Sequence, residues 1–431
     1  MSTTLALVGL SAAVLLAIMG GVKWLGMRFG WEPELQRKAV HVATGLYATA
    51  LPLLFSERWP VLLLIGIAGS VLLLLRLPRF AKTGLGSTLH GVERKSYGEL
   101  LLAVAIAFTF CLSIGKPVLY VLPMAVLTLA DAAAALIGTR YGRKFFAVEV
   151  GTKSAEGVAM FFMVTWIVAM IILLLLTDIG RLNVVLLSLI VAGFGALVEA
   201  DSWHGLDNLF VPVGLHLFLA RHLDTAPLEL VLVAAAFVAA LLAIISFAPL
   251  LGLTAQAARG YTVLFFLIFA VTAPYNAILP SAAVLAHVGA AKVRPDRSPH
   301  PNLDFLGSVA AVAMFWLFLG ELSGVSTLNA YNLSFAGAAV IFAGLALSSR
   351  MLLTGLTAAA LVAIMLATIS WNVERTHGQF LSWLWIAAAI VPCLVVPLIW
   401  PQFLDRHRVA RAFALALPVP LAAFAGLVLA P

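Results

Sequence analysis

The chain has 431 residues, of which 63% are hydrophobic and only 10% are charged, and its mean hydropathy is +1.08. Soluble domains carry about 25% charged residues, so the composition excludes an ordinary soluble domain. Apolar runs long enough to cross a hydrocarbon core of about 30 Å recur along nearly the whole chain, without the short alternating segments of a β-barrel. The sequence therefore predicts an all-α polytopic membrane protein. We expect its net charge of +7 to lie in loops and not to bind nucleic acid.

The apolar runs predict about 14 transmembrane helices. The first run lacks the basic start of a cleaved signal peptide, so we expect it to be a membrane helix. The expected spans are residues 4–22, 39–55, 60–77, 99–114, 117–138, 157–177, 182–198, 226–250, 261–286, 305–322, 330–348, 351–370, 381–400 and 412–430. One further apolar segment, residues 209–220, is too short to cross, and we expect it to be re-entrant or interfacial.

Lys and Arg gather in the loops after the first, third and fifth spans, whereas the alternate loops hold one each, at Arg58, Lys116 and Arg181. This asymmetry predicts that the first set of loops is cytoplasmic. The unusual polar segments all fall on that face, where we expect those around residues 131 and 199–208 to meet in one site. They are residues 37–45, 90–99, 130–157 and 199–208. The basic residues of later loops are also cytoplasmic if segment 209–220 does not cross. This assignment counts residues 261–286 as one span. We expect Pro274 and Pro280 to kink that span.

Asp131 lies in the cytoplasmic part of the fifth expected span. A carboxylate at that depth is costly, so it should have a metal, a base or water as its partner; the alternative is a snorkelling or helix-capping aspartate. Gly138 and Gly142 follow on one helical face, where they serve either helix packing or close approach of a phosphate.

Lys153 and Ser154 immediately precede an apolar helix that starts near Glu156. A helix N-terminus with free N–H groups, a lysine and a hydroxyl is suited to bind an anion. The spacing is not that of a P-loop.

Together these residues resemble the signature of the membrane-embedded CTP-using lipid enzymes, which include dolichol kinase, phytol kinase, CTP-dependent diacylglycerol kinase and, more distantly, phosphatidate cytidylyltransferase. The signature has an acidic residue, small residues, a G-x-x-x-G segment with basic residues, and K-[ST]-x-E-G. The matching positions are Asp131, Ala132, Gly138, Gly142, Lys153, Ser154, Glu156 and Gly157.

Three further segments resemble the phytol and dolichol kinase branch. They match at Arg37, Lys38, His41 and Gly45; at Arg94, Ser96, Tyr97 and Gly98; and at Glu199, Asp207, Asn208 and Pro212. The last segment departs from the cytidylyltransferases, which favours the kinase branch. The resemblance covers about residues 30–250, so we expect a catalytic membrane domain at 1–250 and an additional transmembrane domain of unassigned role at 251–431.

The resemblance implies CTP as phosphoryl donor and Mg²⁺ as cofactor, whose preferred ligands are hard oxygens. It assigns Asp131 and Asp207 to the metal, and Glu199 to a supporting ligand or the base for the lipid hydroxyl. His41 is either a structural histidine or a catalytic base. The implied nucleotide-binding residues are Gly138, Gly142, Lys153, Ser154, Glu156, Gly157, Arg37, Lys38 and Asn208. Asp201, Trp203 and His204 match no motif, and we expect them to be solvated loop residues.

The leading hypothesis is therefore CTP-dependent phosphorylation of a lipid or isoprenoid alcohol, of the phytol or polyprenol type, at the cytoplasmic face of a bacterial-type inner membrane. One alternative is a phosphatidate cytidylyltransferase, which shares the nucleotide site and attacks a different phosphate. The other is a transporter or flippase, which predicts an inverted repeat and charges at mid-membrane depth; no repeat is visible in the sequence.

Overall fold

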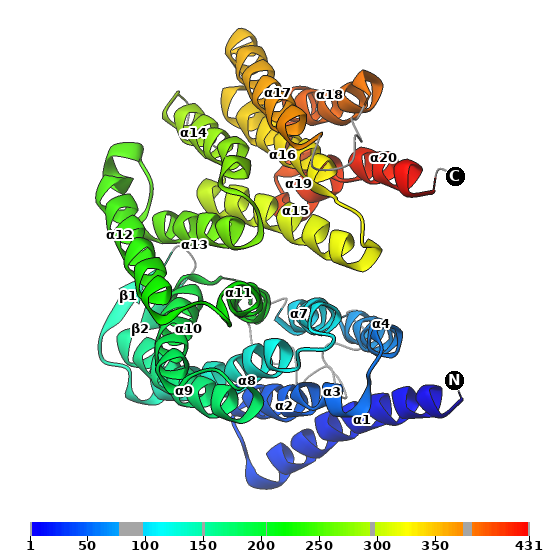
Figure 1. The fold of residues 1–431 in the computed structure, drawn as a ribbon, viewed down its shortest axis with the longest axis vertical. Coiled ribbons are helices and arrows are strands. Elements are labelled where there is room, and N and C mark those ends of the chain that lie inside the picture. The colour runs from blue at the N-terminus through cyan, green and yellow to red at the C-terminus, as the bar shows by residue number, and fades with distance from the viewer. Residues whose placement is uncertain are drawn as a thin grey trace. The chain divides into compact units, whose positions relative to one another are not determined.

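The computed structural model describes residues 2–76, 98–148, 151–203, 205–293, 298–373 and 382–429. Almost all of this part of the chain is helical, and it holds one two-stranded hairpin (Figure 1). Among the described residues, eleven helices are long and apolar enough to cross a membrane, and three shorter helices are also apolar. The expected class, an all-α polytopic membrane protein, is confirmed. The count of about 14 spans stays a prediction.

The chain forms two compact units, Met1–Ala236 and Phe237–Pro431. We expected domains of residues 1–250 and 251–431, and both divisions fall within α12. The elements that begin in the first unit are α1 (Ser2–Phe29), α2 (Pro33–Thr49), α3 (Leu51–Leu54), α4 (Arg58–Leu75), α7 (Gly98–Leu112), α8 (Val118–Tyr141), β1 (Phe145–Ala147), β2 (Thr152–Ser154), α9 (Ala155–Leu176), α10 (Arg181–Asp201), α11 (Asp207–His222) and α12 (Pro227–Leu251).

Helix α8 lies at the centre of the first unit, where it contacts α2, α9 and α11. Its buried positions are distributed around the helix and include the small residues Ala125, Ala130 and Ala134. A helix that is apolar on all sides is suited to burial among other helices. Because small side chains let backbones approach, α8 brings the polar ends of its neighbours together.

A hairpin of β1 and β2 connects α8 to α9. The two strands are antiparallel, and Phe146 lies opposite Lys153. Gly151 has a φ of 96°, in a region of backbone space that glycine adopts without steric cost. Alternate side chains of a strand point to opposite faces, so Thr152 is exposed while Lys153 turns inward. The sequence analysis did not predict this hairpin, because each strand has only three residues.

Segment 209–220 lies within α11, which has 16 residues and is therefore about 24 Å long. The helix packs on α7, α8 and α10 and is buried over most of its length. Nδ1 of His216, in its interior, lies 2.9 Å from the backbone oxygen of Leu119 and 3.3 Å from Oγ of Ser113. The expected short apolar segment is thus a helix enclosed by protein.

The second unit continues with α13 (Ala255–Val271), η1 (Pro274–Ala277), α14 (Ile278–Val293), α15 (Pro301–Ser323), α16 (Leu328–Leu347), α17 (Met351–Val373), α18 (Trp383–Ile399), η2 (Pro401–Leu404), α19 (Arg408–Ala416) and α20 (Pro418–Leu429). Helix α16 is almost entirely buried, and α14, α15, α17, α18, α19 and α20 pack around it.

The single kinked span expected at 261–286 is wrong, because the structure has two helices there, α13 and α14. The first helix ends at Val271, and a 3₁₀ turn that starts at Pro274 separates it from the second. Proline lacks the N–H of a continuing helix, which explains a break at this point. The charge rule favoured a segment 209–220 that does not cross the membrane only if residues 261–286 form one span. With two helices there, the rule no longer favours that interpretation.

Candidate functional site

Helix α2 carries the first basic residues of the site. Pro33 stands in its first turn, where a missing N–H costs no helical hydrogen bond. Lys38 and His41 are three residues apart and so lie on one face of the helix. Both side chains reach Asp131 of α8: Lys38 Nζ donates to its two carboxylate oxygens at 2.9 and 2.7 Å, and His41 Nε2 lies 3.3 Å from Oδ2.

The Lys38–Asp131 pair is buried, with both side chains 7% exposed. A buried ion pair of this kind adds little net stability, but removal of one partner leaves an uncompensated charge and costs about 3–5 kcal/mol. Asp131 therefore has the partner that its depth in the span requires, and that partner is a lysine 93 residues earlier in the chain. The sequence analysis assigned Lys38 to a phosphate and did not predict the pair.

A second lysine–carboxylate pair lies beside the first. Lys153 of β2 donates from Nζ to Oε1 of Glu199 and to the backbone oxygen of the same residue, both at 2.6 Å. Burial lowers the pKa of Lys153, but the carboxylates of Glu199, Asp207 and Asp131 outweigh that effect and hold the pKa above its ordinary value. Lys153 is therefore a permanent cation in the site.

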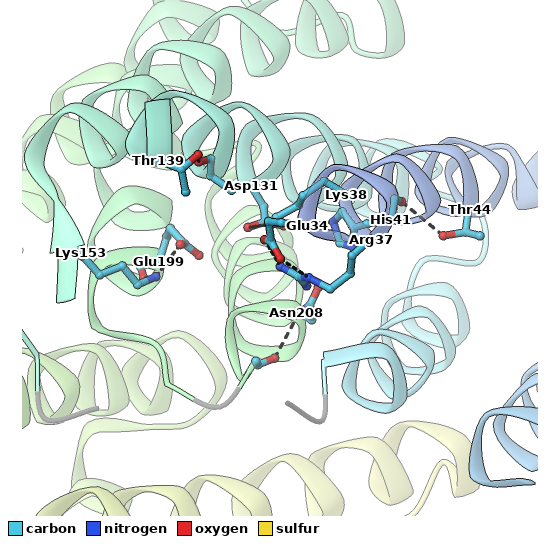
Figure 2. Close-up of polar contacts among 12 residues, drawn as sticks. Glu34, Arg37, Lys38, His41, Thr44, Asp131, Thr139, Lys153, Glu199 and Asn208 are labelled. Carbon is cyan, nitrogen blue, oxygen red and sulfur yellow. Dashed lines mark hydrogen bonds and ion pairs between the residues drawn. The ribbon is translucent and has the colours of Figure 1, made fainter. Parts of the chain in front are cut away.

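Three carboxylates converge between these lysines. Figure 2 shows two of them, Asp131 and Glu199. Asp131, Glu199 and Asp207 each offer an oxygen, and these oxygens all lie within 4.8 Å of one another. They come from α8, from the last turn of α10 and from the first turn of α11. The expectation that the segments around residues 131 and 199–208 meet in space agrees with this arrangement.

Three buried polar atoms in this cluster make no hydrogen bond within the described part of the chain. Oε2 of Glu199, Oδ1 of Asn208 and Nε2 of His41 are buried and make no hydrogen bond. An unsatisfied buried acceptor costs about 1–3 kcal/mol, so its retention needs an explanation such as an unrecorded ion or ligand. The three carboxylates, which include the free Oε2 of Glu199, and the free amide oxygen of Asn208 form the hard oxygen donor set that Mg²⁺ prefers. The residues present therefore fit a magnesium ion.

Arg37 lies on α2 one residue before Lys38 but pairs differently. Its guanidinium donates to both carboxylate oxygens of Glu34, at 3.0 and 2.6 Å. The side chains are 30% and 41% exposed, so this pair is at the rim of the site (Figure 2). The sequence analysis did not identify Glu34. Its spacing of three residues before Arg37 on a helix is a signal that could have found it.

The glycines of the signature lie where α8 meets α9. A methyl group on Gly138 would stand 2.8 Å from Oγ of Ser154 and 3.5 Å from Cα of Gly157. One on Gly142 would stand 2.3 Å from the backbone oxygen of Gly138. At Gly138 the close approach is thus between α8 and the start of α9, which agrees with the packing alternative, whereas the atom nearest to a methyl group on Gly142 belongs to α8 itself. The role of both glycines in nucleotide binding stays a prediction.

Ser154 and Glu156 shape the start of α9. Ser154 is the N-cap, and its Oγ accepts a hydrogen bond from the N–H of Gly157 at 3.1 Å. The Glu156 carboxylate accepts from the backbone N–H groups of Arg143 at 3.0 Å and Lys144 at 3.2 Å. These bonds fix the chain between α8 and the hairpin, and they hold Lys153 at its place in the site.

Two further expectations concern residues outside the cluster. Four of the residues concerned lie outside the described residues: Arg94, Ser96, Tyr97 and His204. Gly98 is the first residue of α7. Asp201 was expected to be solvated, but it is the last residue of α10 and only 6% exposed. That expectation is wrong, because α10 extends past the predicted end of its span.

Over 216 residues, the chain is 31% identical to phytol kinase from Synechocystis sp.. The match covers 48% of this chain and 87% of that protein. No family model matches the chain, and no solved structure matches it. About half of the chain therefore has no counterpart in that relative.

Proposed function

The chain belongs to the phytol kinase family, and on this basis we propose that it transfers a phosphoryl group from CTP to a lipid or isoprenoid alcohol. The observation that carries the proposal is the convergence of Asp131, Glu199 and Asp207 with Lys38 and Lys153. Phosphoryl transfer is catalysed mainly by positioning and by electrostatic stabilisation of phosphate charge. A cluster of oxygen ligands flanked by fixed cations supplies both.

Asp131 and Asp207 would hold Mg²⁺, with Glu199 as a further ligand or as the base for the acceptor hydroxyl. When bound, Mg²⁺ neutralises charge on the transferring phosphates. The oxygens that the described residues offer suit this ion, and the unsatisfied Oε2 of Glu199 is an oxygen that would coordinate it.

Lys38 and Lys153 neutralise the carboxylates in the structure as it stands. Their ammonium groups would turn to phosphate oxygens once a cation occupies the carboxylate cluster. Each lysine offers three donors on a flexible stem, which permits such a change of partner without movement of the backbone. Arg37, at the rim, would bind a more distal phosphate or the leaving diphosphate.

His41 lies beside Asp131 at the edge of the carboxylate cluster. Nε2 makes no hydrogen bond and stands 3.3 Å from Oδ2 of Asp131. A ring nitrogen held beside a carboxylate is positioned to accept the proton of a hydroxyl and to be stabilised as it becomes charged. We assign His41 as one candidate for the base that accepts the proton of the lipid hydroxyl, and Glu199 is the other candidate.

The position of this site at the cytoplasmic face is part of the proposal. It is supported by the excess of Lys and Arg in the loops after the first, third and fifth expected spans. CTP is a cytoplasmic nucleotide, so a CTP-using site is expected on this side.

The test uses the full-length protein purified in detergent with CTP labelled either on the γ-phosphate or on the α-phosphate. The proposal predicts that γ-label enters an isoprenoid alcohol and that α-label does not. Transfer of α-label to phosphatidate would identify a cytidylyltransferase instead. ATP and GTP serve as competing donors, and equal use of all three would refute the assignment of CTP.

A further inference from the structure

An apolar cavity of about 170 Å³ lies beside the carboxylate cluster, between α1, α2, α4 and α7. Its lining follows one face of α2 and continues to α3, through Arg37, His41, Thr44, Ala48 and Leu51. Residues three and four apart share a helical face, so this lining is a single row along the helix. The ten residue steps from His41 to Leu51 correspond to about 15 Å of helix. The cavity is therefore elongated along α2.

The two ends of the cavity differ in polarity. Arg37, His41, Glu99 and Asn208 line one end, and the cavity shares His41 and Asn208 with the polar cluster around the three carboxylates. The other end is lined by aliphatic side chains, among them Leu51 and Leu64. A cavity with one polar end and an apolar remainder matches a molecule with one polar group on a hydrocarbon chain.

The polar groups along the apolar part are satisfied by the protein. Tyr47 donates to Oγ of Ser11 at 2.7 Å, and Ser11 donates to the backbone oxygen of Leu7 at 2.8 Å. Thr44 donates to the backbone oxygen of Val40 at 2.7 Å. These groups therefore demand no polar partner from a ligand, and genuinely apolar cavities of this kind bind hydrocarbon in place of water.

We propose that this cavity binds the hydrocarbon chain of the acceptor alcohol, with the hydroxyl at His41 and the chain extending along α2 toward Leu51. The proposal rests on the proposed kinase function and adds the acceptor subsite. The cavity volume favours one chain: a cavity of about 150 Å³ holds a single benzene molecule, so a comparable volume holds part of one narrow chain and not two side by side. This volume favours single-chain alcohols as the acceptor class over diacylglycerol, whose two chains it would not hold side by side.

Ala12 and Ala13 of α1 provide a matched pair of positions for the test. Ala12 lines the cavity, whereas Ala13 is exposed and does not. The Tyr47–Ser11 hydrogen bond places Ala12 at the level of Tyr47, six residues and about 9 Å past His41. A phenylalanine at position 12 therefore fills the deep part of the cavity and leaves the polar end open.

The experiment compares Ala12→Phe with Ala13→Phe in the full chain, with a short and a long saturated primary alcohol as acceptors. For Ala12→Phe we expect kcat/KM for the long alcohol to fall by roughly tenfold or more, since misfit of even one methylene in an apolar pocket changes this ratio by about 10–200-fold. The short alcohol and the KM for CTP should change little, and Ala13→Phe should resemble the wild type. An unchanged preference for chain length in a folded Ala12→Phe protein would overturn the proposal.

A binding measurement separates this subsite from the catalytic assignment. A long alcohol carrying an alkyl diazirine should label residues of α1, α2, α4 or α7, and unlabelled alcohol should compete while phospholipid should not. Competition by phospholipid alone would mean that bulk lipid fills the cavity and would overturn the proposal. Specific labelling without phosphorylation of any alcohol would instead contradict the proposed kinase function and leave the subsite standing. Loss of labelling in Ala12→Phe, with labelling kept in Ala13→Phe, supports the site even if activity is too low to compare.

Discussion

Replacement of Lys153 by alanine tests whether the lysine has a catalytic role beyond its structural one. From the sequence, we expect Lys153 to lie in a loop where its loss leaves folding intact. The structure changes this expectation, because Lys153 Nζ contacts Glu199 Oε1 at 2.6 Å and the Glu199 side chain is only 9% exposed. The substitution leaves a buried carboxylate without its cation, so we expect an effect on stability as well as on turnover.

The size of each effect follows from this contact. Loss of one partner of a buried ion pair costs about 3–5 kcal/mol, and protonation of the orphaned carboxylate would reduce that cost. Loss of a charged donor to a phosphate in the transition state costs about 10²–10³ in rate. Glu199→Gln in the same protein removes the orphaned charge. The double variant Lys153→Ala/Glu199→Gln should therefore recover much of the stability lost by Lys153→Ala but none of the activity.

The assay combines unfolding of the purified protein in detergent with transfer of γ-label from CTP to an alcohol. Lys144→Ala is the matched control, since Lys144 lies close by on the same connection and is exposed. We expect the control to have near-normal stability and turnover. Near-normal turnover of Lys153→Ala would refute the assignment of this lysine to phosphate. If the double variant regained activity along with stability, the lysine would be purely structural.

Three further predictions concern packing, domain organisation and the hairpin. Gly138→Ala should destabilise the protein by about 1–3 kcal/mol in unfolding measurements, because its methyl group would stand 2.8 Å from Ser154 Oγ at the α8–α9 contact. Gly193→Ala in α10 is the control and should be close to neutral, because no atom lies within 4 Å of its methyl group. Residues 1–255 expressed alone should bind CTP with Mg²⁺, because all the clustered site residues precede residue 209; a monodisperse fragment that does not bind would show that the second unit contributes. Glu156→Ala should raise the KM for CTP more than it lowers kcat, because it removes the hydrogen bonds from the Arg143 and Lys144 backbone N–H groups that hold the hairpin. An equal fall in kcat and kcat/KM would contradict this positional role.

The class of fold and the gathering of three carboxylates could be predicted from the sequence. Apolar runs of membrane-spanning length are a local signal, and most of the expected spans correspond to helices within a few residues. Asp131 is a carboxylate at the end of an apolar run, where it needs a partner, and the resemblance to the lipid kinases identifies Glu199 and Asp207. Neither inference required knowledge of which helices are neighbours.

The pairing inside the site could not be predicted in this way. Lys38 and Asp131 are 93 residues apart, and Lys153 and Glu199 are 46 apart, so both pairs depend on how α2, α8 and α10 pack. Helical periodicity specifies the face of a helix but not its neighbour. The break between α13 and α14 was missed for a different reason: a proline within an apolar run is compatible with either a kink or two helices.

The central claim is that Asp131, Glu199 and Asp207 hold the divalent cation of a CTP-using site. It is tested most directly by electron paramagnetic resonance of Mn²⁺, used in place of Mg²⁺, with the full-length protein and CTP. Asp207→Asn is the best variant, since no ion pair within the described residues depends on Asp207 in the way that Lys38 depends on Asp131. The account predicts that wild-type protein binds Mn²⁺ together with CTP and that a folded Asp207→Asn protein binds it far more weakly. Equal binding of Mn²⁺ and CTP by the two proteins would contradict it.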